Sequence, residues 1–282
     1  MLQCKEKYTV KDMCAAMKIS ESGYYRWLKN QSKQTSRELL TVKIKEILAE
    51  HPDNSNYGIE RIKIALERKG TMVSRRTVYR AMSESGLLHK RRVPRRITKA
   101  TTEIQEKENI IKGNFGSDKP KTKLITDITE VRCLDGKLYV SPVMDCFNGE
   151  IIALEMCENM KKELCIDTIR QIVSCRGAIL HSDRGSQYTS EAFRSLLAKK
   201  GIMQSLSGAG HCYDNARMES FFATLKKEKL YQIPTHRMLR EEVKSVIFKY
   251  IFGYYNTQRI NSFNPGGLPP VVYRRMMPNV AA

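Results

Sequence analysis

Apolar residues in the N-terminal third of the chain recur three and four positions apart, which is the spacing of amphipathic helices. Residues 8–29 predict two short helices joined by a turn, and residues 36–50 predict a longer helix. Residues 57–88 predict a second helical pair, in which Gly70 ends the first helix and Ser74 caps the second. Both pairs are typical of helix-turn-helix modules, although a plain helical hairpin explains the first pair nearly as well.

After residue 123 the periodicity changes to that of β-strands. Three alternating apolar runs, separated by Asp-Gly and Asn-Gly turns, predict an antiparallel meander over residues 125–133, 137–144 and 150–157. Helices and strands then alternate over residues 161–175, 178–181, 190–200 and 202–206. The order βββαβαβα predicts an α/β ribonuclease-H-like core, a mixed five-stranded sheet with helices, preceded by all-α helix-turn-helix modules.

The chain is strongly basic, with a formal net charge of +19 and a pI near 9.6. Residues 1–122 hold 27 Lys and Arg against 14 acidic residues, so most of the excess lies in the helical part. This balance predicts a polyanionic partner, although ribosomal and membrane-surface proteins can be as basic. The polar first residues and the lack of an apolar run of about 20 residues predict a cytoplasmic protein without a membrane segment. Eight scattered cysteines predict free thiols, not disulfides or zinc ligands.

Basic residues on the predicted helices are candidate DNA contacts. A recognition helix presents its first residues to a DNA groove, and the second helix of residues 57–88 begins with basic residues. The following segment, residues 89–123, opens with the basic run KRRVPRR and predicts a linker that lies along phosphates. A solvated basic face is the alternative. The predicted DNA-binding residues of these segments are Arg26, Lys29, Arg75, Arg76, Arg80, Arg91 and Arg92.

Three acidic residues form a candidate catalytic set. Asp127 lies in an apolar β-type segment, Asp183 follows an apolar strand, and Glu219 lies in a predicted helix. Taken singly, Asp183 fits an ordinary turn and Glu219 fits a solvated helix face, so only their combination indicates a site. Asp135 and Asp145 compete with Asp127, but Asp135 belongs to a turn and Asp145 ends a strand before a loop.

Three carboxylates without a counter-charge repel one another, so their grouping indicates divalent cations. Oxygen ligands favour Mg²⁺ or Mn²⁺, and a pair of such ions is the standard device for phosphoryl transfer, so we expect two per active site. Because a metal-activated water needs no separate base, His181 and His211 are expected to be structural or to contact DNA. Gln258 and Arg259 either contact DNA or complete the core.

The motifs also carry a family resemblance. TDIT around Asp127, HSDRGSQYTS around Asp183, a 35-residue interval and CYDNARMESFFATLKKE around Glu219 resemble the integrase core of transposases of the insertion-sequence-three family, with retroviral integrases more distant. Residues 57–88 resemble its second helix-turn-helix, and YIFGYYNTQRINSFNPGGLPPVVY resembles its C-terminal signature. The resemblance implies that the three acids are the metal-binding catalytic triad, that Lys226 contacts donor-end DNA, and that Asn215 contacts DNA from the same helix.

Patterns and resemblance together divide the chain into five parts. We expect a first helix-turn-helix in residues 1–35, a second helix-turn-helix region in 36–90, a basic linker in 91–123, a catalytic core of the Asp-Asp-Glu (DDE) integrase type in 124–232 and a C-terminal helical extension in 233–282.

The function predicted from these observations is that of a DNA transposase. It would bind terminal inverted repeats and catalyse metal-dependent strand cleavage and strand transfer. The predicted partners are double-stranded DNA, including target DNA, further copies of the chain in at least a dimer, and an upstream-frame protein of the same element. The predicted location is the cytoplasm, in association with the nucleoid. A catalytically inactive DNA-binding regulator and a ribonuclease-H-like structure-selective nuclease are the alternatives.

Overall fold

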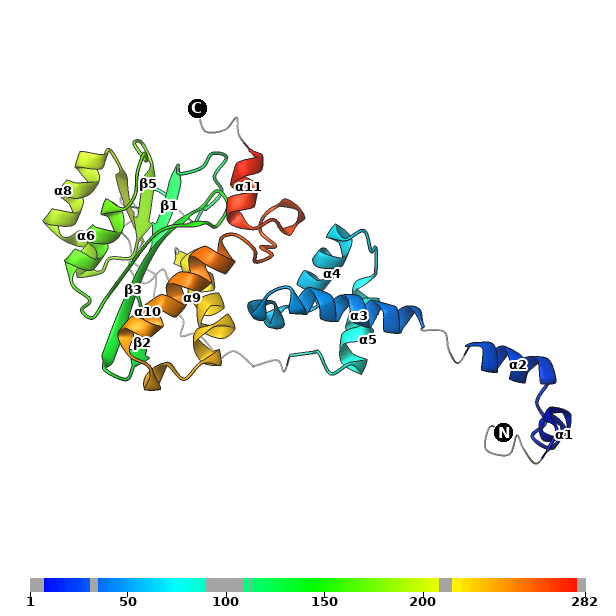
Figure 1. Cartoon of the computed structure of the whole chain (residues 1–282). Coiled ribbons are helices and arrows are strands. Elements are labelled where there is room, and N and C mark those ends of the chain that lie inside the picture. Colours follow the sequence, from blue (N-terminus) through cyan, green and yellow to red (C-terminus); the bar gives the residue numbers. More distant parts are fainter. Residues whose placement is uncertain (1–7, 31–34, 90–108, 112, 208–214, 278–282) are drawn as a thin grey trace, which may run out of the picture. The chain divides into compact units, whose positions relative to one another are not determined.

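The computed structural model describes residues 8–30, 35–89, 109–111, 113–207 and 215–277 (Figure 1). The chain forms two compact units. The helical unit comprises residues 1–52 and 57–89, and the sheet unit comprises residues 53–56 and 90–282. The predicted division into five parts is finer than these two units and stays a prediction. No helix within the described residues is long and apolar enough to span a membrane.

The helical unit begins with the predicted pair of short helices, α1 (Val10–Ala16) and α2 (Glu21–Asn30). The side chain of Thr9 caps α1, and the Ser20 hydroxyl accepts a hydrogen bond of 3.1 Å from the Gly23 N–H at the start of α2. Tyr24 is buried, whereas Met17 and Trp27 are exposed although the spacing of the apolar residues places them on the inward faces of these helices. Helices this short offer little surface to cover a second apolar side chain.

Three further helices, α3 (Ser36–Ala49), α4 (Ile59–Arg68) and α5 (Arg75–Glu84), pack on one another in the helical unit. Thr35 and Glu38 form a capping box that begins α3, Gly70 follows α4 with φ near 75°, and Ser74 caps α5 as predicted. The predicted apolar stripes of α4 and α5 are buried, but α3 leaves Leu39 and Val42 exposed. The fully buried residues of this core are Ile44, Ile62, Leu66, Val78, Ala81 and Met82.

The sheet unit contains a mixed sheet whose strands are β1 (Lys123–Thr126), β2 (Thr129–Cys133), β3 (Gly136–Asp145), β4 (Ile151–Cys157), β5 (Ile179–Ser182) and β6 (Met203–Leu206). β3 pairs antiparallel with β1, β2 and β4, while β5 runs parallel to both β1 and β6. The sheet therefore has the mixed character that the sequence predicts.

The first predicted strand, residues 125–133, is divided into β1 and β2, so the described sheet has six strands where five are predicted. Both pieces keep one register along β3, since Thr126 lies opposite Val143 and Thr129 lies opposite Val140. The interruption falls opposite Pro142, which has no N–H to donate to the ladder. Asp127 consequently stands at the end of β1, outside the regular hydrogen bonds of the sheet.

Helices cover the sheet on two sides (Figure 1). α6 (Lys162–Arg170) and α8 (Glu191–Lys200) bury apolar side chains against β1, β3, β4 and β5, with Phe193 and Leu180 in the centre of this core. α9 (Ala216–Glu228) and α10 (Arg240–Phe248) lie on the other side. The remaining described elements are the short helix α7 (Ser186–Thr189), the π-helix η7 (Lys249–Tyr255), α11 (Pro270–Met276) and the 3-10 helices η2 (Pro52–Asn56), η5 (Leu230–Gln232), η6 (Thr235–Arg237) and η8 (Pro265–Gly267). α6 is shorter than the predicted span of residues 161–175.

Candidate active site

Asp127 is the most enclosed of the three candidate acids. It directly follows β1, and its Oδ1 accepts a hydrogen bond of 2.8 Å from the Ile128 N–H. The pKa of this carboxyl is raised to about 7, chiefly by burial and also by the charges of Asp183 and Glu219. The Ile128 hydrogen bond and the charge of Lys226 act in the opposite direction. Asp127 is therefore within the electrostatic influence of Asp183, Glu219 and Lys226.

Asp183 reaches the same region from the neighbouring strand. It follows the last residue of β5, and β5 is parallel to β1, so both strands end at the same edge of the sheet. Its Oδ1 accepts a hydrogen bond of 2.9 Å from the Gly185 N–H. A Cβ atom at Gly185 would lie 2.8 Å from the Gln187 Oε1 and 3.1 Å from the Asp183 Oδ1, so a side chain there would push these two side chains aside. The Gly185 N–H thus orients the Asp183 carboxylate, and a residue without a side chain leaves room for this contact.

α9 supplies Glu219 and Lys226. Asn215 precedes the helix, is 6% exposed, and donates from Nδ2 to the Thr126 carbonyl oxygen at 3.4 Å. Thr126 is the residue before Asp127, so this contact joins the start of α9 to the end of β1. Glu219 lies one turn into the helix and is exposed. DNA contact by Asn215 and Lys226 stays a prediction, and the structure gives Asn215 a tethering contact.

The charges of Asp183 and Glu219 act on Asp127, but the three carboxylates do not form a closed cage of ligands. Within the described part of the chain, no three Asp, Glu, His or Cys side chains are grouped so that they could hold one metal ion. Mg²⁺ seldom needs such a cage, because it usually keeps several waters and takes only one or two protein carboxylates together with phosphate oxygens. Pairs of these oxygen donors therefore suit hard divalent cations.

The competing acids have structural partners. Asp135 accepts hydrogen bonds of 2.9 Å from both the backbone N–H and the Nε of Arg240. Asp145 is fully buried and accepts from the backbone N–H groups of Lys121 and Phe147 at 2.8 and 3.0 Å. Burial raises the pKa of Asp145 to about 6, while these two hydrogen bonds lower it. Both acids stabilise loops, as the sequence argument expects for Asp135.

Four residues have two expected roles each: His181, His211, Gln258 and Arg259. His181 is fully buried, with Nδ1 2.9 Å from the Ser205 hydroxyl and Nε2 3.2 Å from the Ser207 hydroxyl, which is a structural position. Arg259 is 6% exposed and completes the core through Glu228. Gln258 is exposed and donates to the Gly253 carbonyl, and His211 lies outside the described residues.

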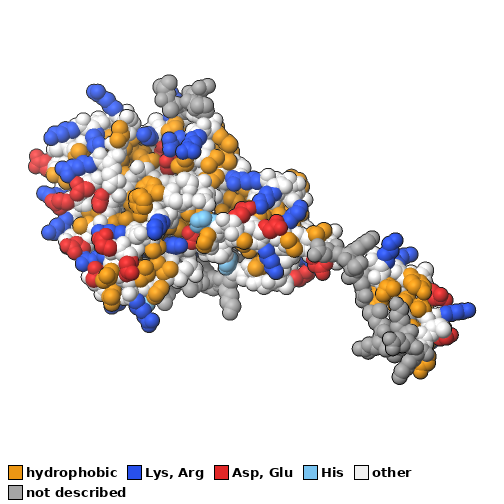
Figure 2. All heavy atoms as spheres, viewed as in Figure 1, with side chains coloured by type: hydrophobic (Ala, Val, Ile, Leu, Met, Phe, Trp, Pro, Cys, Tyr) orange, Lys and Arg blue, Asp and Glu red, His pale blue; other side chains and the backbone are white. Residues whose placement is uncertain are grey.

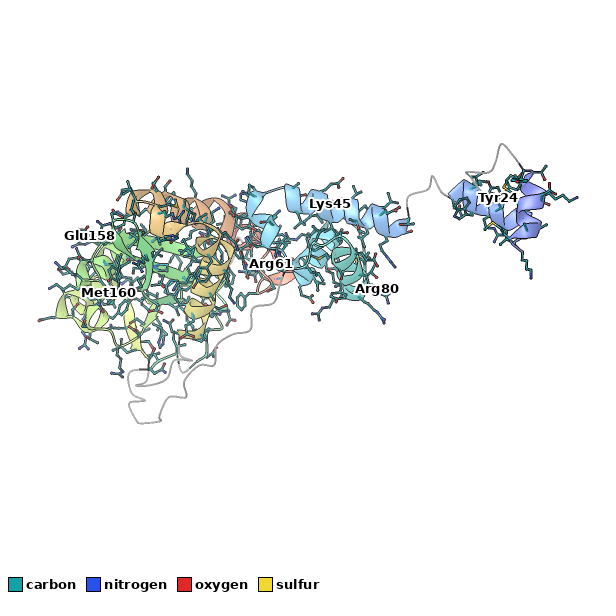
Figure 3. The ribbon with its side chains drawn as sticks, turned by 90° about the horizontal axis from the view of Figure 1, so that it is seen from below. Tyr24, Lys45, Arg61, Arg80, Glu158 and Met160 are labelled. Atoms are coloured by element: carbon teal, nitrogen blue, oxygen red, sulfur yellow. The ribbon has the colours of Figure 1, made fainter. Side chains whose placement is uncertain are left out.

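The predicted DNA-binding residues of the helical unit are accessible. Arg26 and Lys29 on α2, and Arg75, Arg76 and Arg80 on α5, are all exposed. Figure 3 shows Arg80 at the edge of the unit, directed away from its helices. Arg75 also forms an ion pair of 2.7 Å with Glu60. Figure 2 shows Lys and Arg spread over the visible face, not gathered in one patch. Arg91 and Arg92 lie outside the described residues.

Several residues that hold α9 in place were not predicted from the sequence. Glu228 lies at the end of α9 and is bound by Arg259 and Tyr250, and residues of η2 bind beside it. At the other end, Arg217 donates to the backbone carbonyls of Cys146 and Phe115. The burial of polar residues in the segment PDNSN has no periodic signal in the sequence, so these contacts appear only in the folded chain.

Three protein-family models match this chain. Models of the family described as integrase core domain match residues 117–212 and 219–277, and a model described as HTH-like domain matches residues 35–95. The chain is 32% identical, over 99% of its own length, to InsK of insertion sequence element IS150 from Escherichia coli K12. The match covers 98% of InsK. It is 29% identical to InsF, the transposase for insertion sequence IS3A of the same strain, over 94% of this chain and 93% of that protein.

Among solved structures, the fold resembles a chain in the cryo-EM structure of the simian T-cell lymphotropic virus intasome in complex with the PP2A regulatory subunit B56 gamma. The TM-score is 0.50 at 14% identity, over 78% of this chain and 77% of that chain. This likeness concerns the fold, and it agrees with the predicted ribonuclease-H-like class.

Proposed function

This chain belongs to the IS3 family of insertion-sequence transposases with an integrase core, and we propose that it cleaves and joins DNA strands at the terminal inverted repeats of its element. Membership of this family makes it an enzyme of the polynucleotidyl transferase type. The finer proposal is a metal-dependent reaction of the Asp-Asp-Glu kind, in which Asp127, Asp183 and Glu219 are the catalytic residues.

The observation that carries the proposal is that acids from two other elements, Asp183 and Glu219, act on the enclosed carboxyl of Asp127. Asp127 follows β1, Asp183 follows β5 and Glu219 lies on α9, yet the pKa of Asp127 is raised by burial and, in addition, by the charges of the other two acids. Like charges brought together repel, so the fold gains no stability from this grouping. A function that requires concentrated negative charge accounts for it.

The oxygen donors fit divalent cations. Asp127, Asp183 and Glu219 would hold two Mg²⁺ or Mn²⁺ ions per active site, one with Asp127 and Asp183 and one with Asp127 and Glu219. Each ion would then have two protein carboxylates, with water and DNA phosphate oxygens as its other ligands. When bound, such ions polarise the attacking water or 3′-hydroxyl and stabilise the leaving oxygen.

The remaining residues bind and orient the DNA in this proposal. Lys226, whose charge acts on Asp127, neutralises a phosphate at the donor end. Asn215 holds the start of α9 to the end of β1. The arginines of α5 contact the terminal repeat. Because two DNA ends must be held together, we propose at least a dimer on DNA. Target DNA and an upstream-frame protein of the same element are the other proposed partners, and the proposed location is the cytoplasm, with the nucleoid.

The test is strand transfer on duplex oligonucleotides that carry the terminal repeat, with MgCl₂ or MnCl₂. Wild-type protein should join the donor 3′ end to target DNA. Asp183→Asn and Glu219→Gln should reduce joining at least about a hundredfold, the scale of losing one principal source of transition-state stabilisation. The exposed residues Asp118 and Glu163 provide matched controls, because Asp118→Asn and Glu163→Gln make the same chemical changes elsewhere.

The same assay separates the two alternatives. A catalytically inactive regulator binds the ends and joins none, in wild type and variants alike. A structure-selective nuclease hydrolyses the donor without joining it. Either result would contradict the proposed strand transfer.

A further inference from the structure

The connection between α3 and α4 is polar yet buried. It consists of η2, whose sequence is PDNSN, and its residues Asp53 and Asn54 are 8% and 6% exposed. Connecting segments with such residues normally face water. Buried polar groups need hydrogen-bond partners, so the position of η2 is fixed by specific contacts. Residues 53–56 belong to the sheet unit, although the chain on either side of them belongs to the helical unit.

The contacts of η2 lie at the end of the catalytic helix and on η7. Asn56 donates from Nδ2 to the Glu228 carbonyl oxygen at 3.0 Å. Lys229 donates to the Asp53 carboxylate at 3.0 Å, and Tyr254 donates from its hydroxyl to the Asn54 Oδ1 at 3.1 Å. The last carbonyls of a helix have no donor within the helix, and Asn56 supplies a donor to one of them.

The end of α9 is also close, along the helix, to the proposed site residues. Glu228 follows Lys226 by two residues and Glu219 by nine. At a rise of 1.5 Å per residue, nine residues span about 14 Å of rigid helix. A shift of the last turn therefore moves Lys226 nearly as far and changes the direction of the segment that carries Glu219.

Resting on the proposed function, we infer that Asp53, Asn54 and Asn56 form a coupling latch. The latch transmits binding of terminal-repeat DNA by α3, α4 and α5 to α9, and so to Lys226 and Glu219. The covalent order supports this role, because η2 lies directly between α3 and α4, and a rearrangement of these helices on DNA acts on both of its ends. The latch residues are positioning residues, since they contact α9 and η7 and not the reacting atoms.

The test compares two donor duplexes, one with the full terminal repeat and one cut back to its outermost base pairs. The measured quantity is the ratio of joining rates on the full and short donors, which reports how strongly repeat binding stimulates the active site. Asn56→Ala, Asp53→Lys and Lys229→Asp should each lower this ratio at least about fivefold, the low end of typical coupling between sites. The double variant Asp53→Lys with Lys229→Asp restores the ion pair and should restore the ratio.

The controls isolate the latch from general damage. Lys249→Asp makes the same charge change at an exposed position of η7 and should keep the wild-type ratio. Thermal unfolding of each variant checks that it is folded. Single variants that keep the wild-type ratio, or a double variant that fails to regain it, would overturn the latch while leaving strand transfer intact. If the wild type joins neither donor, the proposed function fails and the latch fails with it.

Discussion

Arg259 donates two hydrogen bonds of 2.8 Å to the carboxylate of Glu228 in the interior of the sheet unit. Tyr250 donates a third, at 2.9 Å, to the same carboxylate. A buried charge is tolerated only when paired and hydrogen-bonded, and this bidentate arrangement satisfies the condition. The pair joins the last residue of α9 to the segment that follows η7, so the C-terminal part of the chain is fastened to the catalytic helix.

Removing one member of this pair should be far more damaging than removing a surface pair. We expect Arg259→Ala to lower the free energy of unfolding by about 3–5 kcal/mol, because the buried Glu228 carboxylate would lose the guanidinium charge that balances it. Urea denaturation measures the change. The matched control is Arg170→Ala, which removes an exposed ion pair with Asp167 and should cost less than about 1 kcal/mol. Equal costs for the two variants would contradict the buried role of Arg259.

The raised pKa of Asp127 predicts a stability that depends on pH in metal-free protein. Its folded pKa is about 7 against an ordinary value of 3.8, so folding is penalised progressively as pH rises from 3.8 to 7 and fully above 7. Asp127→Asn removes the charge and should be more stable than wild type at pH 8 in EDTA, by no more than a few kcal/mol since one pKa unit is about 1.4 kcal/mol. The advantage should shrink toward pH 5.

Chemical denaturation at pH 5, 6.5 and 8 measures this difference. Glu163→Gln, an equivalent loss of charge at an exposed position, should show no comparable trend. A wild type that is more stable than Asp127→Asn at pH 8 without metal would show that the carboxylate is not in a repulsive environment.

Local rules predicted the parts of the fold that depend on a few neighbouring residues. Gly70 and Ser74 delimit α4 and α5 as expected, because a left-handed residue and an N-cap act within one turn. The break between β1 and β2 was missed, since its cause, Pro142, lies on the neighbouring strand. Sequence spacing alone also could not show that Trp27 stays exposed, because it defines the faces of a helix but not what covers them.

The candidate site likewise contains residues that the sequence points to and residues that it does not. The triad stays a prediction: only Asp127 interrupts a local pattern, and the family resemblance supplies its combination with Asp183 and Glu219. The role of Arg259 could not, because its partner Glu228 lies 31 residues away and a basic residue in a helical segment fits DNA contact equally well. The burial of Asn54 depends on Tyr254, 200 residues further along the chain. Such contacts are determined by tertiary packing.

Metal binding should be measurable as stability, independently of catalysis. A ligand that binds only the folded protein stabilises it by RT ln(1 + [L]/Kd), so Mg²⁺ at about ten times its Kd adds about 1.4 kcal/mol. We expect Mg²⁺ or Mn²⁺ to raise the Tm of the wild type at pH 8 and to have little effect on Asp127→Asn. Asp118→Asn should respond like the wild type. An equal rise in all three proteins would indicate nonspecific ion effects and would contradict the assigned ligands.

The exposed arginines of α5 should contribute to DNA binding through phosphates, bases or both, and salt dependence distinguishes these contributions. A residue that neutralises one phosphate reduces the slope of log K against log salt by about 0.9 when it is removed. We expect Arg76→Ala and Arg80→Ala each to weaken binding to the terminal repeat and to reduce the slope by about one unit if they contact phosphate. A base contact would instead relax specificity at one position, with about 1–3 kcal/mol lost there. Fluorescence anisotropy over a series of salt concentrations, with Arg132→Ala on β2 as an exposed control, measures both. If Arg76→Ala and Arg80→Ala match that control in affinity and slope, the basic face of α5 contacts only solvent.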